Sequence, residues 1–188
     1  MAALRFRKQV PASRRLSQRI SEGDGIAIIV CVEDADGARA AETQGAKAIA
    51  IRSAIVGIRT ATSLPLLWIG AGRPVDADAV CVRPDAELEE SHVEAVVDVR
   101  DEDELEAALE EIDPEIFLLS AIGADDDEDP LDAVLELLPD VPAGKLAIAQ
   151  VDVSTREEVL ALERAGIDAV LVTRGEISSL VGHRPLEV

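Results

Sequence analysis

The stretch IIVCVEDADGARAAETQGAKAIAI, residues 28–51, contains one complete strand–helix–strand unit. It begins with an apolar run, continues through a polar segment rich in alanine, and ends in a second apolar run after Gly45. Residues 148–172, IAQVDVSTREEVLALERAGIDAVLV, repeat this order, and residues 96–119, VVDVRDEDELEAALEEIDPEIFLL, repeat it without the glycine. Repetition of such a unit favours parallel strands, either closed into a barrel or arranged as a doubly wound sheet.

Eight short runs of valine, isoleucine, leucine and alanine lack helical spacing and have the length of strands. Uninterrupted apolar runs of this kind are typical of parallel strands that are buried on both faces. Eight strands in alternation with helix-like segments favour a closed ring, so the predicted fold class is α/β, a compact (β/α)8 TIM barrel. The predicted strands are residues 26–32, 48–52, 64–69, 79–82, 93–99, 115–120, 146–151 and 169–173.

The connections between the predicted strands limit the helices. Barrels of this type usually take about 250 residues, and this chain has 188. GAGRPVDAD (70–78) and PDAELEESH (84–92) leave no room for a full helix, so we predict reduced helices after strands three and four. Ser154 with Glu157 matches a capping box, which predicts a helix that starts there and ends at Gly166.

The composition excludes several classes of partner. With 18 cationic and 38 acidic side chains, the formal net charge is −20, which argues against nucleic acid because phosphate binding needs a basic face. No apolar run reaches the roughly 18 residues of a membrane span, and the N-terminus lacks the apolar core of a signal peptide, so we expect no membrane contact and a cytoplasmic protein. Cys31 and Cys81 lie in apolar runs, and His92 and His183 have no partner at ligand spacing, so we predict neither a metal nor a cofactor.

The N-terminal segment has the opposite charge to the rest of the chain. We expect residues 1–24 to form a basic segment with a short helix, and residues 25–188 to form a single barrel domain. The segment either packs against the acidic body or serves as a docking arm for an acidic protein partner. The first 20 residues contain no acid and six cations, namely Arg5, Arg7, Lys8, Arg14, Arg15 and Arg19.

The candidate site follows from the predicted fold, because TIM barrels place their active sites at the carboxyl ends of the strands. Asp98 is the candidate catalytic residue at that end, and Trp68 could either stack on a planar ligand or plug the barrel mouth. Several arginines there predict a small anionic metabolite as ligand, held by bidentate contacts. The alternative is that each arginine pairs with a carboxylate at the same end. The predicted ligand-binding arginines are Arg52, Arg83, Arg100 and Arg174.

The order of these units resembles the indole-3-glycerol phosphate synthase family of the phosphate-binding (β/α)8 barrels. Residues 151–177, VDVSTREEVLALERAGIDAVLVTRGEI, are similar to that family's seventh and eighth units. Residues 93–110, VEAVVDVRDEDELEAALE, are similar to its fifth unit, and residues 23–34 stand where it has its first strand. The resemblance spans residues 12–182 and implies a barrel with a phosphorylated ligand and a link to tryptophan biosynthesis.

The family's activity is a carboxy-lyase reaction that closes an indole ring on a phosphorylated anthranilate derivative. By resemblance, Asp98 stands at the position of the strand-five glutamate, and Gly175 at or near that of the ligand-binding glycine after strand eight. The strand-three lysine, the family's proton donor, falls in LLWIGAG (66–72), which contains no lysine. Because general acid catalysis needs a donor within hydrogen-bond reach, this departure argues against the family's reaction.

Two functional hypotheses remain, and they leave open whether the chain is an enzyme. The first is a diverged barrel that has lost the parent reaction and binds a small anionic ligand or acts as a scaffold. The second is an active lyase or isomerase of the same superfamily with a relocated acid and base, such as Asp98 with Arg100 or Asp152. They differ in whether Asp98 and the arginines surround an open pocket or pair off with one another.

The charge balance generates a prediction about salt. Only Lys8, Lys47 and Lys145 are lysines, and few lysines with many acids are typical of halophilic proteins, although GC-rich codon usage has the same signature. If repulsion between carboxylates matters, potassium chloride should raise the melting temperature, because the screening length falls from about 30 Å at 0.01 M to about 3 Å at 1 M. Differential scanning calorimetry in potassium chloride and in sodium sulfate would measure this. A flat or falling melting temperature in chloride would favour codon usage instead.

Overall fold

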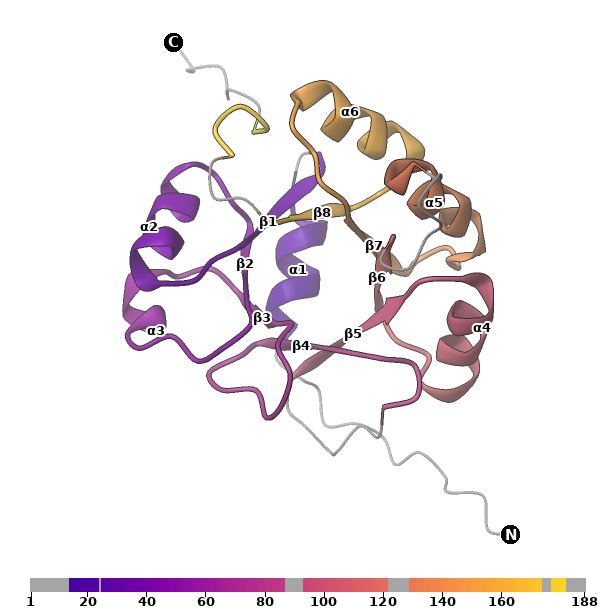
Figure 1. The fold of residues 1–188 in the computed structure, drawn as a ribbon, viewed down its shortest axis with the longest axis horizontal. Coiled ribbons are helices and arrows are strands. Elements are labelled where there is room, and N and C mark those ends of the chain that lie inside the picture. Colours follow the sequence, from indigo (N-terminus) through magenta and orange to yellow (C-terminus); the bar gives the residue numbers. More distant parts are fainter. Residues whose placement is uncertain (1–13, 24, 87–92, 122–128, 174–176, 182–188) are drawn as a thin grey trace, which may run out of the picture.

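Eight parallel strands form a closed ring in the computed structural model, which describes residues 14–23, 25–86, 93–121, 129–173 and 177–181 (Figure 1). Each strand pairs with the next one along the chain, and the last pairs with the first. The strands are β1 (Ala27–Cys31), β2 (Ala48–Ile51), β3 (Leu66–Trp68), β4 (Ala79–Val82), β5 (Glu94–Val99), β6 (Ile116–Ser120), β7 (Leu146–Gln150) and β8 (Ala169–Val172).

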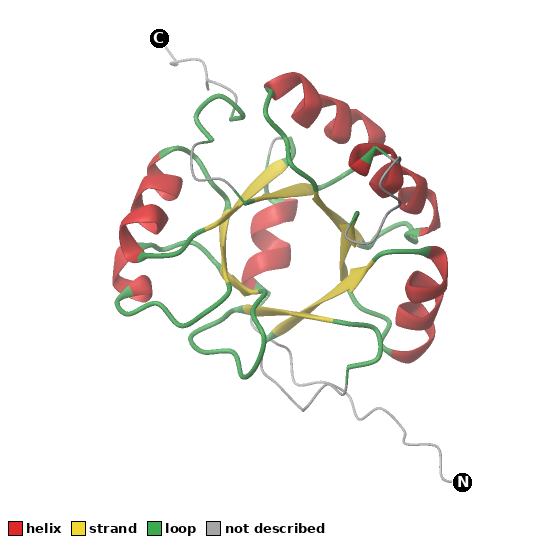
Figure 2. Cartoon of the chain, viewed as in Figure 1, coloured by secondary structure: helices red, strands yellow, loops and turns green. Residues whose placement is uncertain are grey.

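The helices surround this ring unevenly (Figure 2). α2 and α3 lie outside one part of the ring and α4, α5 and α6 outside another, while loops alone run past β4 in the described residues. Each helix has at most ten residues, about half the length that a membrane crossing requires. The helices are α1 (Arg15–Ser21), α2 (Ala35–Thr43), α3 (Ile58–Ala61), α4 (Glu102–Glu111), α5 (Pro130–Leu137) and α6 (Arg156–Ala165), with a 3₁₀ turn at Leu138–Asp140.

The predicted fold class, a compact TIM barrel with some helices missing, is confirmed. No helix occurs between β3 and β4, where residues 69–78 form an irregular loop with several bends. Between β4 and β5, residues 83–86 and 93 are not helical, and residues 87–92 lie outside the described part of the chain. A further reduction was not predicted: α3 is a single turn of four residues, which begins after Gly57 with its φ of 78°.

The predicted capping box of α6 is wrong by one residue. Thr155, not Ser154, is the N-cap, and its hydroxyl oxygen accepts a hydrogen bond from the Glu158 N–H at 3.3 Å. The Glu158 carboxylate accepts one in return from the Thr155 N–H at 3.0 Å. The sequence Ser-Thr-Arg-Glu-Glu fits the pattern in two registers, so only the backbone geometry separates them. Gly166 ends the helix in a left-handed conformation, as predicted.

Helix α1 closes the amino end of the barrel and is seen through the ring of strands in Figure 1. Its Leu16 and Ile20 are buried in the apolar cluster that fills the inside of the ring. The buried carboxylate of Glu94, on β5, accepts hydrogen bonds from the Leu16 N–H at 2.7 Å and from the N–H and hydroxyl of Ser17. Glu94 thus satisfies N–H groups that the first turn of a helix otherwise leaves without partners.

The described part of the basic N-terminal segment packs against the acidic body. Arg15 donates to Asp78 at 2.9 Å, and Arg14 pairs with Glu115. Residues 1–13, which contain Arg5, Arg7 and Lys8, lie outside the described residues. The boundary after residue 24 and the acidic protein partner of this segment therefore stay predictions.

Replacement of Glu94 by alanine should loosen the closure of the barrel. The variant leaves two buried N–H groups of α1 without an acceptor, so we expect the free energy of unfolding to fall by about 2–4 kcal/mol. Urea denaturation measures this difference. Glu106→Ala, which removes an exposed acid from α4, is the matched control and should change it by less than about 0.5 kcal/mol. Equal midpoints for the two variants would show that Glu94 does not hold α1.

Candidate functional site

The alternation of side chains along each strand places a group of charged residues on the inside of the barrel at its carboxyl end. Val96 belongs to the inner apolar cluster, so Asp98, two residues further along β5, faces the same way, and Arg83, just after β4, reaches it. Arg52 directly follows β2, and its charge opposes the rise that burial causes in the pKa of Cys31, a member of the same cluster, so Arg52 lies near the same end of the barrel. These side chains therefore share the mouth of the barrel.

Asp98 is the centre of this group. The residue is 8% exposed, and its Oδ2 lies 3.3 Å from Arg83 Nη1 and 3.4 Å from Arg100 Nη2. Its Oδ1 is buried and has no hydrogen-bond donor among the described residues. Both arginines thus share one oxygen of the carboxylate, and the other oxygen is left unpaired.

Arg83 is held on several sides. Its Nη1 donates to the Asp98 carbonyl oxygen at 3.0 Å, and its Nη2 pairs with Glu104, on the first turn of α4. Burial disfavours the charged form, but the hydrogen bond to Glu104 and the charges of Asp98 and Glu104 outweigh it and raise the pKa of Arg83. Glu104 also accepts a hydrogen bond from the Arg100 N–H at 2.9 Å, so it ties α4 to the mouth.

Arg52 and Arg100 have more freedom than Arg83. Arg100 is 37% exposed in its side chain, and its only described side-chain contact is the long one to Asp98. Arg52 is exposed, and its guanidinium has no ion pair or hydrogen bond within the described ranges. Its backbone is fixed by Gly70, where an added Cβ would lie 1.8 Å from the Arg52 carbonyl oxygen. Only glycine allows the chain after β3 to approach β2 so closely.

The structure does not bring every predicted site residue to the mouth. Trp68 belongs to the apolar cluster outside the ring, is 4% exposed, and donates from its indole N–H to the Gly70 carbonyl at 2.9 Å. The Trp68 side chain therefore points to the outside of the ring, away from the arginines at the mouth, and does not plug the mouth. Arg174 and Gly175 lie outside the described residues, so their predicted contacts with a ligand stay predictions.

Two participants were not predicted from the sequence. Glu104 matches the position of a helix-capping residue, and that local role hid its contact with Arg83. Cys81 sits beside Asp98 and is a free thiol, like Cys31. Burial and the charge of Asp98 raise the pKa of Cys81 to about 12. The signal for Cys81 was its inward position on β4, which becomes readable only once the register is known. Glu104 lies on α4, and the strand pattern carries no signal for it.

The arrangement separates the two functional hypotheses only in part. Asp98 pairs with Arg83 and Arg100, as expected for a mouth whose charges neutralise one another. Arg52 stands apart from this cluster, and the fourth arginine of the prediction is not described. Within the described residues, the mouth offers the guanidinium of Arg52, which has no partner there, and that of Arg100, which is weakly held. Such groups can bind an anion.

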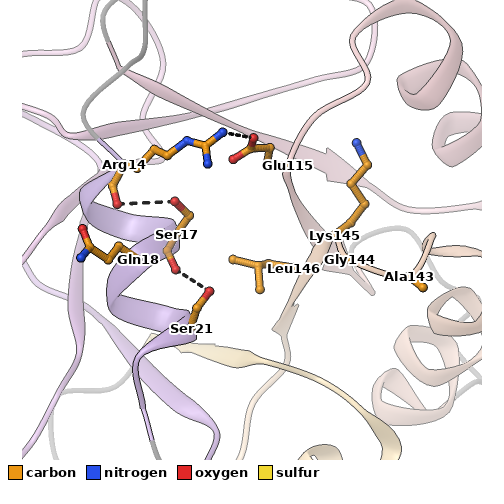
Figure 3. Close-up of a pocket in the computed structure, with 9 residues that line it drawn as sticks. All are labelled: Arg14, Ser17, Gln18, Ser21, Glu115, Ala143, Gly144, Lys145 and Leu146. Atoms are coloured by element: carbon orange, nitrogen blue, oxygen red, sulfur yellow. Dashed lines mark hydrogen bonds and ion pairs between the residues drawn. The ribbon is translucent and has the colours of Figure 1, made fainter.

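A hollow of about 560 Å³ lies at the other end of the barrel, between α1 and the amino ends of β6 and β7 (Figure 3). Its charged and polar groups are already engaged: Arg14 pairs with Glu115, and Ser21 donates to the Ser17 carbonyl at 2.9 Å. Lys145 pairs with a loop carboxylate at 2.6 Å. The hollow therefore offers a ligand fewer available groups than the mouth does.

Comparison with known proteins supports the fold. The structure of N-acetylmannosamine-6-phosphate 2-epimerase from Clostridium perfringens is similar, with a TM-score of 0.61 and 16% sequence identity over 81% of this chain and 87% of that chain. No protein-family model matches the chain, and no curated protein matches its sequence. The likeness shows the TIM barrel and does not single out the indole-3-glycerol phosphate synthase family.

The raised pKa of Cys81 predicts slow alkylation in the folded protein. In a Cys31→Ala variant, iodoacetamide at pH 8 should modify the native thiol about a thousandfold more slowly than the urea-unfolded one, because about three pKa units separate the two states. The native rate should rise with pH beyond the range in which an ordinary thiol levels off. Mass spectrometry of timed samples measures both rates, with Cys81→Ala as the control for Cys31. Similar native and unfolded rates would contradict the burial of Cys81 beside Asp98.

Proposed function

We propose that this barrel binds a small anionic, phosphorylated metabolite at the carboxyl-end mouth and has lost the ring-closing reaction of the family that it resembles. The observation that carries the proposal is the guanidinium of Arg52. It lies at the carboxyl end of the barrel, directly after β2, without an ion-pair partner among the described residues, although the protein has 38 acidic side chains. An arginine that stays unpaired among so many acids is available to an exogenous anion.

The chemistry of the mouth fits a phosphate better than a simple monovalent anion. Guanidinium groups present their N–H donors in a fork that matches two phosphate oxygens. Arg100 adds a second guanidinium that is held by one long contact to Asp98. The structurally similar epimerase acts on a sugar 6-phosphate, which supports the choice of a phosphorylated ligand here.

The positions of the lysines support the loss of the parent reaction. Lys47 directly precedes β2 and Lys145 directly precedes β7, so both lie at the amino end of the barrel, away from the mouth. Lys8 lies outside the described residues. The cations described at the mouth are arginines, which stay protonated at physiological pH and so are poor proton donors. The mouth is therefore suited to binding an anion rather than to the acid catalysis of ring closure.

A ligand that binds only the folded protein must raise its melting temperature. We expect members of a panel of phosphorylated metabolites, tested at 0.15 M and 1 M potassium chloride, to raise it by several degrees at low salt and by less at high salt. Arg52→Ala should abolish the shift. Arg39→Ala removes an exposed arginine from α2 and should retain it.

Two outcomes would count against this function. If no phosphorylated compound shifts the wild type at either salt concentration, the scaffold hypothesis is favoured, in agreement with the ion pairs of Asp98. If Arg52→Ala and Arg39→Ala reduce the shift equally, binding is a general effect of charge and does not occur at the mouth.

A further inference from the structure

We propose that the barrel forms a symmetric dimer in which a second copy of this chain covers the side beside β3 and β4, where a helix is missing. The proposal goes beyond the ligand at the mouth and does not depend on it. Its basis is a long stretch of sequence, residues 43–75, which contains no aspartate and no glutamate, although 38 of the 188 residues of the chain are acidic.

The exposed part of this stretch forms one continuous surface. Arg59, on α3, donates hydrogen bonds to the Asp76 carbonyl oxygen and, at 2.8 Å, to the Asp78 carboxylate, so α3 is tied to the loop after β3. The start of that loop, at Gly70, lies against the Arg52 carbonyl oxygen just after β2. The two loops therefore lie side by side. We call their exposed residues within 52–60 and 71–75 the acid-free face.

Apolar side chains are exposed on this face. Among the described residues, the exposed large apolar side chains are Val56, which is 98% exposed, and Val75, which is 47% exposed, and both belong to the acid-free face. Further along the chain, Val80 and Val82 of β4 pack against the outer apolar cluster but are only partly buried, because no described helix covers them (Figure 2). A partner that covers this side would remove apolar surface from water, which is the main driving force of protein association.

The charged residues of the face are those that protein interfaces favour. They are Arg52, Arg59 and Arg73, and interface cores are enriched in arginine and depleted of aspartate, glutamate and lysine. Arg73 is exposed and has no ion pair among the described residues. The composition and the exposed valines therefore agree that this face suits contact with a protein rather than with water.

Charge indicates a second copy of this chain as the partner. Two chains that each carry a net charge of −20 repel one another, so they approach most easily where neither presents a carboxylate. The loop after β3 is also complementary to itself. With a two-fold axis between Pro74 and Val75, Arg73 lies opposite the partner's Asp76, and the same pair forms again by symmetry. Arg73 and Asp76 are exposed, and neither side chain has an ion pair among the described residues.

Sedimentation equilibrium of the wild type, without ligand, tests the dimer. Between about 1 and 200 µM protein, the mass should rise from that of one chain towards twice that value. The dimer Kd should tighten about tenfold or more from 0.05 M to 1 M potassium chloride, because salt screens the repulsion between the chains and leaves the apolar contact intact. A single-chain mass throughout at 1 M salt would overturn the proposal. Association that weakens with salt would also overturn it, and would favour an acidic partner held by the arginines.

Three variants assign the dimer to the acid-free face. Val56→Asp and Val75→Asp each place an acid on it and should weaken the dimer at least tenfold, and both should fold because the replaced side chains are exposed. Ala143→Asp adds the same charge in the exposed loop before β7, across the ring from β3, and should change the dimer Kd by less than about twofold. A dimer that tolerates both valine variants would overturn the proposal.

A double-mutant cycle tests the two-fold axis. In 0.15 M potassium chloride, Arg73→Gln and Asp76→Asn should each weaken the dimer by about 3- to 10-fold, since two pairs are lost at once. The double variant should be no weaker than either single variant, because the same pairs are absent from all three. Losses that add in the double variant, or no loss in any of them, would overturn the symmetric arrangement.

Discussion

The closure of the strand ring is the constraint on which the rest of this structure depends. β8 pairs with β1 from Ala27 with Ala169 to Val30 with Val172, so every strand has two neighbours and no edge is left open. The interior of so narrow a ring must be filled by side chains, and small residues such as Ala48 and Ala79 make room there for larger ones. Because the ring itself satisfies the backbone, the chain can omit the helix between β3 and β4 and still keep its core.

Closure also determines where charge can be buried, and three carboxylates show this. Asp78, Glu94 and Asp98 are each 7–8% exposed. Glu94 is held by α1, and Asp78 by Arg15, Arg59 and a backbone N–H. Burial alone would raise the pKa of Asp78, but these hydrogen bonds and charges lower it. Of the three, only Asp98, at the carboxyl end, keeps a buried oxygen without a described donor, so the two fully satisfied carboxylates lie at the amino end.

The lysines and the arginines are also divided between the two ends of the barrel, and this division bears on function. The lysines described in the barrel lie at its amino end, whereas the mouth carries arginines. An arginine holds an anion well but does not release its proton, so an arginine-lined mouth favours recognition over proton transfer. The fold is shared with an enzyme that acts on a sugar phosphate, yet a shared fold leaves the chemistry to the residues at the site.

The sequence by itself determined the strands, because an apolar run between turns is a local pattern: the range predicted for β4 is the observed one, and the others differ by two residues or fewer at each end. It also determined that Arg83, Asp98 and Arg100 would gather at one end of the barrel. Only the tertiary structure decided that Trp68 faces outward, since a three-residue strand carries no signal of which face is buried. The tertiary structure alone also decided that one oxygen of Asp98 lacks a donor, because the partners of a buried group come from side chains far apart in the chain.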